Sequence, residues 1–198
     1  MNHESNVKLD RPGAGLPFFE SFIGRHFTFP KLTRSLTWQS AVDLFQRQGE
    51  KIVVIAESLS ENELTHRVLI KRIRGIEDSS RFWSVGMVMK HLIMVGSDML
   101  KLIQMLNRGE TPHVKVDVAD YKPKEIHDKS IIPKFIEMQK HNVDTLRNEE
   151  GKQNLELTHT HPWFGPINSF EWNCLAAIHQ VVQLALQMFL YCTKIVLF

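Results

Sequence analysis

Two histidines and a glutamine have the spacing that could bring them together in one metal site. His179 and Gln183 are four residues apart in an apolar stretch, so in a helix they would lie one turn apart on the same face. His91 lies in a second apolar stretch, on the same predicted face as Val88 and Leu92. Neutral imidazole is a common ligand of zinc, nickel, iron and copper, whereas glutamine is a poor ligand of these ions. The three side chains therefore predict a degenerate or atypical divalent-metal site, for zinc or nickel, beside a polar pocket for a small molecule.

A structural role accounts for the same histidines. A single histidine on an apolar helix face is more often a hydrogen-bonded core residue than a metal ligand. Two such histidines on facing helices make a metal site about as plausible as a core role, because side chains from facing helices converge inside a bundle. The residues by themselves leave both interpretations open.

The elements that would position these residues are four helices. Apolar residues recur at steps of three and four in stretches at about 37–59, 84–107, 129–148 and 168–192. Thr37 and Ser84 are candidate N-caps. Ser60 with Glu63 has the spacing of a capping box. No stretch has a convincing strand pattern, so the predicted fold class is all-α, a four-helix bundle with a long crossover at 109–127.

The predicted pocket lies where the second and the last of these helices face each other. Val88 and Trp172 share the helix faces of His91 and His179, and Trp83 directly precedes the second helix. We therefore expect Trp83, Val88 and Trp172 to line the pocket.

Residues 1–36 lack the pattern of a bundle helix. Prolines and glycines interrupt this stretch, yet five phenylalanines make it too apolar for a free tail: Phe18, Phe19, Phe22, Phe27 and Phe29. We expect an extended arm that lies over the bundle or over a partner subunit. The predicted organisation is an N-terminal arm at 1–36 and a bundle domain at 37–198.

The composition is that of an ordinary globular domain. The 198 residues are 43% hydrophobic and 23% charged, which is enough apolar material for a core that needs neither metal nor disulfide to fold. The formal net charge is only +2 and the basic residues are scattered, which argues against a nucleic-acid partner. The sequence lacks the glycine-rich dinucleotide motif, the phosphate-binding P-loop and the H-E-x-x-H zinc motif.

The cysteines and the apolar runs predict a cytoplasmic protein. Cys174 and Cys192 fall in one helical stretch, about 27 Å apart, so we expect two reduced core residues and no disulfide. No signal peptide is evident at the N-terminus. The apolar run at 184–198 is interrupted by Gln187 and Lys194 and is too short to span a bilayer, so no membrane partner is expected.

Two segments resemble the DinB-like superfamily. The segment at 83–92, WSVGMVMKHL, resembles the "W-S-x-x-x-x-x-x-H-L" opening of that superfamily's second helix. The segment at 161–166, HPWFGP, followed by Glu171, Trp172 and His179, resembles its "H-P-x-x-G" lead-in to the last helix. Each motif is short, but the two together, in this order and with agreeing spacing from about residue 37 to 192, are fairly specific.

The resemblance implies an up-down-down-up bundle that is often dimeric, with a pocket at one end. Its metal-binding members hold a divalent ion with three histidines, and by position His91 and His179 match two of them, while Gln183 occupies the third position. Three accounts follow: His161 completes the site, Gln183 binds weakly through its carbonyl, or the metal has been lost and the two histidines bond to Gln183 or to water. We favour the last account. His161 has a competing role in shaping the loop before the last helix.

Two classes of function follow. The resemblance implies a metal-dependent enzyme of the thiol-transferase, isomerase or hydrolase type, in which the ion lowers the pKa of a thiol or of a bound water. The alternative is a non-catalytic module for small-molecule binding or interaction, a homodimer held together by the arm and by residues 195–198. The sequence leaves open whether the protein is an enzyme.

Overall fold

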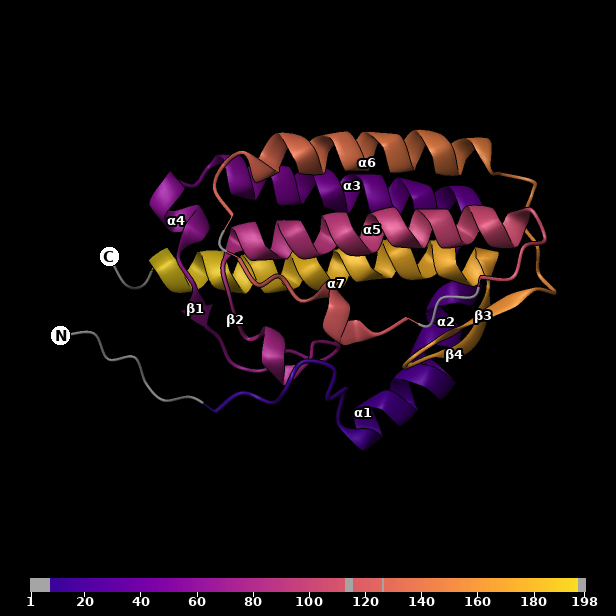
Figure 1. The fold of residues 1–198 in the computed structure, drawn as a ribbon, viewed down its shortest axis with the longest axis horizontal. Coiled ribbons are helices and arrows are strands. Elements are labelled where there is room, and N and C mark those ends of the chain that lie inside the picture. Colours follow the sequence, from indigo (N-terminus) through magenta and orange to yellow (C-terminus); the bar gives the residue numbers. More distant parts are fainter. Residues whose placement is uncertain (1–7, 113–115, 126, 196–198) are drawn as a thin grey trace.

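Four long helices pack side by side as a bundle (Figure 1). The computed structural model describes residues 8–112, 116–125 and 127–195. The bundle consists of α3 (Trp38–Glu57), α5 (Val85–Asn107), α6 (Ile131–Asn148) and α7 (Ser169–Ile195). Both α6 and α7 pack against α3 and against α5, so α3 and α5 lie on one diagonal of the bundle. The predicted bundle of four long helices is confirmed, and each helix lies within three residues of its expected bounds.

Both α3 and α5 begin where a side-chain hydrogen bond satisfies a free backbone N–H group. Thr37 Oγ1 accepts from the backbone N–H of Ser40, and the Ser40 hydroxyl accepts from the N–H of Thr37 in return. Ser84 caps α5 by accepting a backbone N–H of its first turn. Ser60 starts the short helix α4 (Glu61–Thr65) with a second capping box. The N-caps predicted from the sequence are thus confirmed.

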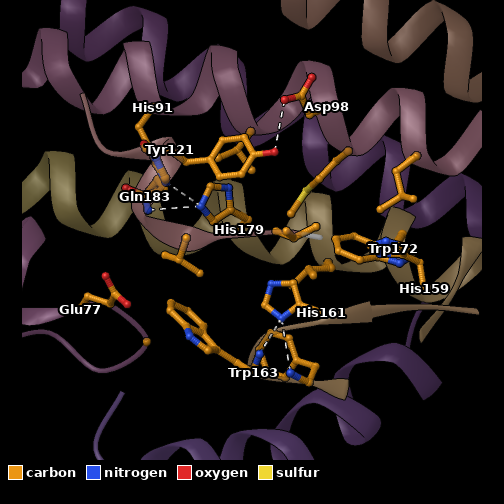
Figure 2. Close-up of a pocket in the computed structure, with 18 of the residues that line it drawn as sticks. Glu77, His91, Asp98, Tyr121, His159, His161, Trp163, Trp172, His179 and Gln183 are labelled. Atoms are coloured by element: carbon orange, nitrogen blue, oxygen red, sulfur yellow. Dashed lines mark hydrogen bonds between the residues drawn. The ribbon is translucent and has the colours of Figure 1, made fainter. Parts of the chain in front are cut away.

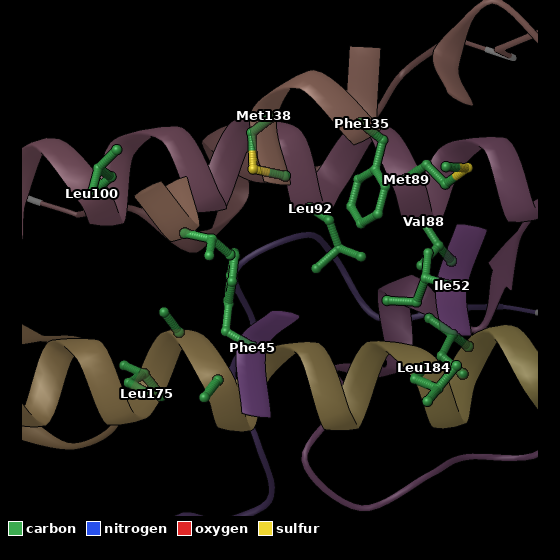
Figure 3. Packing of buried hydrophobic residues seen from close by; sticks show 14 of the residues in the cluster. Phe45, Ile52, Val88, Met89, Leu92, Leu100, Phe135, Met138, Leu175 and Leu184 are labelled. Atoms are coloured by element: carbon green, nitrogen blue, oxygen red, sulfur yellow. The ribbon is translucent and has the colours of Figure 1, made fainter. Parts of the chain in front are cut away.

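The core is a continuous apolar cluster between the four helices (Figure 3). Every bundle helix contributes large side chains that are fully buried: Phe45 and Ile52 of α3, Leu92 of α5, Phe135 of α6 and Leu186 of α7. Each of these side chains stabilises the fold by about 1.5–3 kcal/mol because it leaves water. The core therefore accounts for the association of the helices without any bound group.

Buried polar side chains tie neighbouring helices together at the backbone. Trp38 Nε1 donates to the carbonyl of Leu146 at 2.7 Å and so joins α3 to α6. Asn142 Nδ2 donates to the carbonyl of Gly96 at 2.9 Å and joins α6 to α5. Apolar contacts are non-directional, whereas a carbonyl has a fixed place along its helix, so these bonds set the register of the bundle.

Two short antiparallel ladders lie outside the bundle, where the sequence predicts no strands. They pair β1 (Val68–Leu69) with β2 (Phe82–Trp83), and β3 (Thr158–His161) with β4 (Gly165–Asn168). The strands have only two and four residues, too few for an alternating pattern to stand out in the sequence. The β3–β4 hairpin turns through residues 162–164 and leads directly into α7.

The second half of the N-terminal arm is helical, so the expectation of an extended arm is wrong. α1 (Phe18–Ile23), the π-helical turn η1 (Gly24–Thr28) and α2 (Phe29–Arg34) follow one another without a break. Pro17 directly precedes α1, and Pro30 lies in the first turn of α2, where proline costs no intrahelical hydrogen bond. These two prolines therefore mark helix starts, although the sequence pattern suggested interruptions.

α7 is the longest and one of the most apolar of the helices. An 18-residue stretch within Ser169–Cys192 has a mean hydropathy of 1.4, so this helix is long and apolar enough to cross a membrane, judged by length and composition alone. More than half of that 18-residue stretch, 56%, is buried inside the bundle, and a core helix passes the same test. Both cysteines are on α7 and both are free, but Cys192 is exposed, so only Cys174 is the core residue that we expected.

We expect Gly86→Ala to destabilise the fold by about 1–3 kcal/mol, because the added methyl group would collide with the backbone carbonyl of His127, which cannot turn away as a side chain can. Chemical denaturation monitored by circular dichroism measures the change. Lys101→Ala, on an exposed face of the same helix, is the control and should change stability by less than about 0.5 kcal/mol. Equal stability of the two variants would show that the crossover does not pack on the start of α5 as described.

Candidate functional site

A cavity of about 330 Å³ lies beside α5 and α7 (Figure 2). Its other walls come from the crossover between α5 and α6, from the segment at 75–80 and from the β3–β4 hairpin. Much of its lining is apolar, and includes Ile76, Val95, Met99, Leu102, Trp172 and Leu175. The cavity is therefore mainly apolar, with polar groups gathered at particular points, and it differs in this from the polar pocket that we expected.

His91 and His179 meet at one end of the cavity. Their Nε2 atoms are 3.1 Å apart, and their rings make an edge-to-face contact with centroids 5.0 Å apart. His91 is buried on α5, and its Nδ1 donates to the backbone carbonyl of Tyr121 at 2.7 Å, since a carbonyl can only accept. The Nε2 of a neutral His91 therefore carries a lone pair that points at His179.

Burial keeps both imidazoles neutral. Burial lowers the pKa of His91 to about 4, although the Tyr121 carbonyl partly opposes this effect. The pKa of His179 is also lowered well below its usual value, mainly by burial and then by the neighbouring His91, His161 and Lys122. Each ring therefore has one N–H and one lone pair at neutral pH.

The pair geometry suits either a hydrogen bond or a shared cation. His179 Nε2–H can donate to the His91 lone pair, which pairs the two Nε2 atoms. If His179 instead carries its proton on Nδ1, two lone pairs face each other and a cation between them would stabilise the arrangement. Two nitrogens about 2.05 Å from one zinc ion are about 3.1–3.5 Å apart at near-tetrahedral angles, and the observed Nε2–Nε2 distance of 3.1 Å lies at the short end of this range.

Gln183 is the third member of this group. Its Nε2 lies 3.3 Å from His179 Nε2, one helical turn along α7. The side chain is buried, and its Oε1 has no hydrogen-bond partner in the part of the chain that the structure describes. Turning the amide would exchange the oxygen and the nitrogen, and one of the two would still lack a partner. We call His91, His179 and Gln183 the polar anchor.

His161 has the structural role that competed with metal ligation. Its Nδ1 accepts from the backbone N–H groups of Trp163 at 3.1 Å and of Phe164 at 3.3 Å, so it holds the turn of the β3–β4 hairpin. A neutral ring that accepts at Nδ1 carries its proton on Nε2, so neither nitrogen is free to bind an ion. Among the described residues, no three His, Cys, Asp or Glu side chains are placed to hold a metal ion together.

Of the three residues expected to line the pocket, one does so. Trp172 lines the cavity, whereas Trp83 and Val88 are absent from its described lining. The Trp83 ring packs against the ring of His91, with centroids 5.2 Å apart. Val88 is fully buried in the core (Figure 3). It precedes His91 by three residues, which rotates it by about 60° around the helix, enough to face the core while His91 faces the cavity.

A buried ion pair, which no local sequence pattern indicates, forms another wall of the cavity. Lys122 Nζ lies 2.9 Å from Glu77 Oε2, and their side chains are 10% and 1% exposed. Burial alone would raise the pKa of Glu77, but Lys122 and the backbone N–H groups of Gly15 and Gly13 hold it below its usual value. The pair therefore joins three distant segments: the N-terminal arm, the segment at 75–80 and the crossover.

Tyr121 attaches the crossover to α5 at two points. Its carbonyl accepts from His91, and its hydroxyl donates to Asp98 Oδ2 at 3.2 Å. Burial, together with the charge of Asp98, raises the pKa of the Tyr121 hydroxyl to about 12, so this hydroxyl stays protonated and donates. The crossover thus both orients the His91 ring and covers the cavity.

Comparison with known proteins adds little to this geometry. No family model matches the sequence, and no curated protein matches it. Among solved structures, the crystal structure of TT2238, a four-helix bundle protein, is similar over 76% of this chain and 98% of that chain. The identity is 19% and the TM-score is 0.49, so this similarity carries no inference about function.

The burial of His161 makes stability depend on pH. Burial lowers the pKa of His161 to about 4 in the folded protein, so the unfolded chain takes up the proton first as the pH falls below about 6.5. Between pH 7.5 and 5.0 this histidine alone should lower the free energy of unfolding by about 2 kcal/mol. We expect His161→Gln to lose stability at pH 7.5 but to show a smaller further loss at pH 5.0 than the wild type.

Urea denaturation at the two pH values measures these differences. His141→Gln, on the exposed face of α6, is the matched control and should follow the pH dependence of the wild type. A His161→Gln variant with an unchanged pH dependence would contradict the role of His161 as a buried neutral acceptor.

Proposed function

We propose that this protein binds a small uncharged molecule, with an apolar body and one polar end, in the cavity beside α5 and α7. The observation that carries the proposal is the unpaired amide atom of Gln183 at the end of a mainly apolar cavity. A buried polar atom without a partner costs about 1–3 kcal/mol, which a hydrogen bond from the ligand would recover. The cavity volume of about 330 Å³ is within the range of small-molecule pockets.

The charges around the cavity support an uncharged ligand. Both histidines of the polar anchor are neutral, because burial lowers the pKa of each. Lys122 and Glu77 neutralise each other at 2.9 Å. A charged ligand would lose its hydration without gaining an unmatched counter-charge at the polar anchor, and such burial is costly.

We further propose that the bundle has the up-down-down-up arrangement of the DinB-like superfamily. The course of the chain in Figure 1 supports this, because α3 and α7 run in one direction and α5 and α6 in the other. The two motifs of the resemblance lie at the start of α5 and in the β3–β4 hairpin before α7. In this proposal the polar anchor occupies the place of that superfamily's metal site.

The protein should bind 1-aminoanthracene, an uncharged aromatic amine, at one saturable site that is detected by the fluorescence of the bound probe. Val95→Phe adds a ring to the cavity wall one turn from His91 and should weaken binding by about tenfold or more, because ring and probe compete for volume. Gln183→Leu should weaken it by about three- to tenfold, which corresponds to one hydrogen bond.

The matched control for this experiment is Gln46→Leu. Gln46 lies in the groove between α3 and α6, outside the cavity, so the same substitution there should leave binding at the wild-type level. Thermal denaturation of each variant verifies that it is folded. Wild-type affinity in both cavity variants would rule out this cavity as the binding site.

A divalent ion at the polar anchor is the second candidate, favoured by the Nε2–Nε2 distance of 3.1 Å and by the hydrogen bond from His91 Nδ1 to the Tyr121 carbonyl. Metal-bound histidines commonly donate their other N–H to such a carbonyl. His91 and His179 would hold the ion and Gln183 Oε1 would be a weak third ligand. A bound ion would supply Lewis-acid activation of a thiol or a water, as thiol-transferase, isomerase or hydrolase chemistry requires. Glutamine is a poor ligand of zinc and nickel, so two imidazoles and one amide fit these ions only in part, and we place this candidate second.

Substitution of the weak ligand distinguishes the two candidates. We expect untagged wild-type protein to bind nickel or zinc weakly in calorimetric titrations, and Gln183→His to bind at least about tenfold more tightly, because it supplies a third imidazole. His91→Ala in either background should abolish the binding. One tightly bound equivalent of metal in the wild type would reverse the order of the two candidates and justify assays of thiol-dependent reactions.

A further inference from the structure

The outer side of the helical arm is an aromatic surface that the bundle leaves uncovered. It consists of Phe18 and Phe19, each 77% exposed, Phe27 at 63%, Ile23 at 51% and Phe22 at 47%. The rings of Phe18, Phe19, Phe22 and Phe27 form one chain of contacts with centroid distances of 5.7–6.4 Å. Single exposed apolar residues are common on protein surfaces, but a contiguous cluster such as this marks a docking site.

The arm is fixed to the rest of the fold, so the aromatic surface is presented in a defined orientation. Phe29 is buried and stacks on Phe164 of the β3–β4 hairpin, with centroids 4.5 Å apart. Glu20, on the inner side of α1, binds the guanidinium of Arg72 at 2.6 Å and accepts the backbone N–H of Gly75. The exposed phenylalanines therefore project from a folded helical segment rather than from a loose leader.

Positive charge accompanies the aromatic surface. Arg25, Lys31 and Arg34 are exposed on η1 and α2, and His26 lies beside the ring of Phe22 with centroids 4.7 Å apart. Glu20 is the single acidic residue between Phe18 and Arg34, and its charge is matched by Arg72. The surroundings of the aromatic surface thus have a net positive charge.

This combination distinguishes between two possible partners. In a twofold dimer the aromatic surface would meet its own copy and bring the same cations together, which is unfavourable. An anionic lipid surface complements both features, because aromatic side chains enter the interfacial region of a bilayer while arginine and lysine contact the lipid phosphates. We propose that the aromatic surface docks this protein onto an anionic membrane, with α1 and η1 lying in the plane of the interface.

Such docking differs from the expectation of no membrane partner, which was argued only from the lack of a spanning segment. Docking would also affect the cavity, because Phe164 lines the cavity and its ring stacks on Phe29 of the arm. A docked arm would therefore place one cavity wall close to the lipid, where molecules with apolar bodies gather. The docking proposal stands on the surface itself and does not depend on what the cavity binds.

Flotation with lipid vesicles tests the proposal. The probes are vesicles of phosphatidylcholine alone and vesicles in which about one third of the lipid is phosphatidylglycerol. The wild-type protein should float with the anionic vesicles and, to a much smaller extent, with the neutral ones. The triple variant Phe18→Ser, Phe19→Ser, Phe27→Ser should reduce the bound fraction on anionic vesicles by about tenfold or more.

One further variant tests the contribution of the positive charges to membrane binding, and a second is a control for the loss of exposed apolar side chains. Lys31→Glu with Arg34→Glu should weaken binding to anionic vesicles while leaving the small binding to neutral ones unchanged, and added salt should act in the same direction. Val54→Ser with Ile136→Ser is the matched control, since it removes exposed apolar side chains from α3 and α6, and it should bind as the wild type does.

The competing outcome is self-association through the same surface, which is one of the roles expected of the arm. Of the segment 195–198, the other part of the expected dimer contact, residues 196–198 lie outside the described residues. Light scattering after size exclusion measures the mass of the wild type and of the triple phenylalanine variant, and circular dichroism verifies that both are folded. Membrane docking is supported if wild-type protein binds anionic vesicles and the triple variant does not. It is overturned if the wild type fails to bind them, or if the triple variant changes from dimer to monomer while vesicle binding stays the same.

Discussion

The packing of α7 along both α3 and α5 is the interaction on which the rest of the structure depends. One face of α7 completes the apolar core, and a neighbouring face holds His179 within 3.1 Å of His91 on α5. A slip of a single residue would rotate α7 by about 100° and separate the two imidazoles. Asn173 and Gln187 oppose such a slip by donating to backbone carbonyls of α3 at 3.1 and 3.0 Å. The same directional bonds therefore hold the core and the polar anchor in place.

Burial determines what the polar anchor can do. In water an imidazole would gain a proton near pH 6.5, but burial lowers the pKa of His91 to about 4, so its lone pair stays available at neutral pH. The carbonyl of Tyr121 decides which nitrogen carries that lone pair. A neutral pair with a neighbouring amide suits hydrogen bonding to an uncharged ligand, and it would offer an ion only neutral ligands. The amide of Gln183 in place of a third imidazole is thus the feature that most separates the two proposed functions.

The arm, the β3–β4 hairpin and the buried ion pair are joined in an outer layer beside the cavity. His161 accepts the backbone N–H groups of the hairpin turn, and Phe164 of that turn stacks on Phe29 of the arm. Glu77 accepts backbone N–H groups of the arm while it pairs with Lys122 of the crossover. Breaking a buried pair by removing one partner typically costs about 3–5 kcal/mol, so this layer is firmly attached. The aromatic surface of the arm faces outward because its inner side is occupied by these contacts.

The sequence by itself determined the features that depend on neighbours three or four residues away: the four helices, the caps at Thr37 and Ser84, and the helix positions of His91, His179 and Gln183. A helix repeats every 3.6 residues, so local spacing is enough to find it. Only the tertiary structure decided the rest, such as the use of the His161 lone pair, the pairing of Glu77 with Lys122 and the helical form of the arm. These features arise from groups whose partners are distant in sequence, or from segments too short to show a period, and no local pattern specifies which of them will meet.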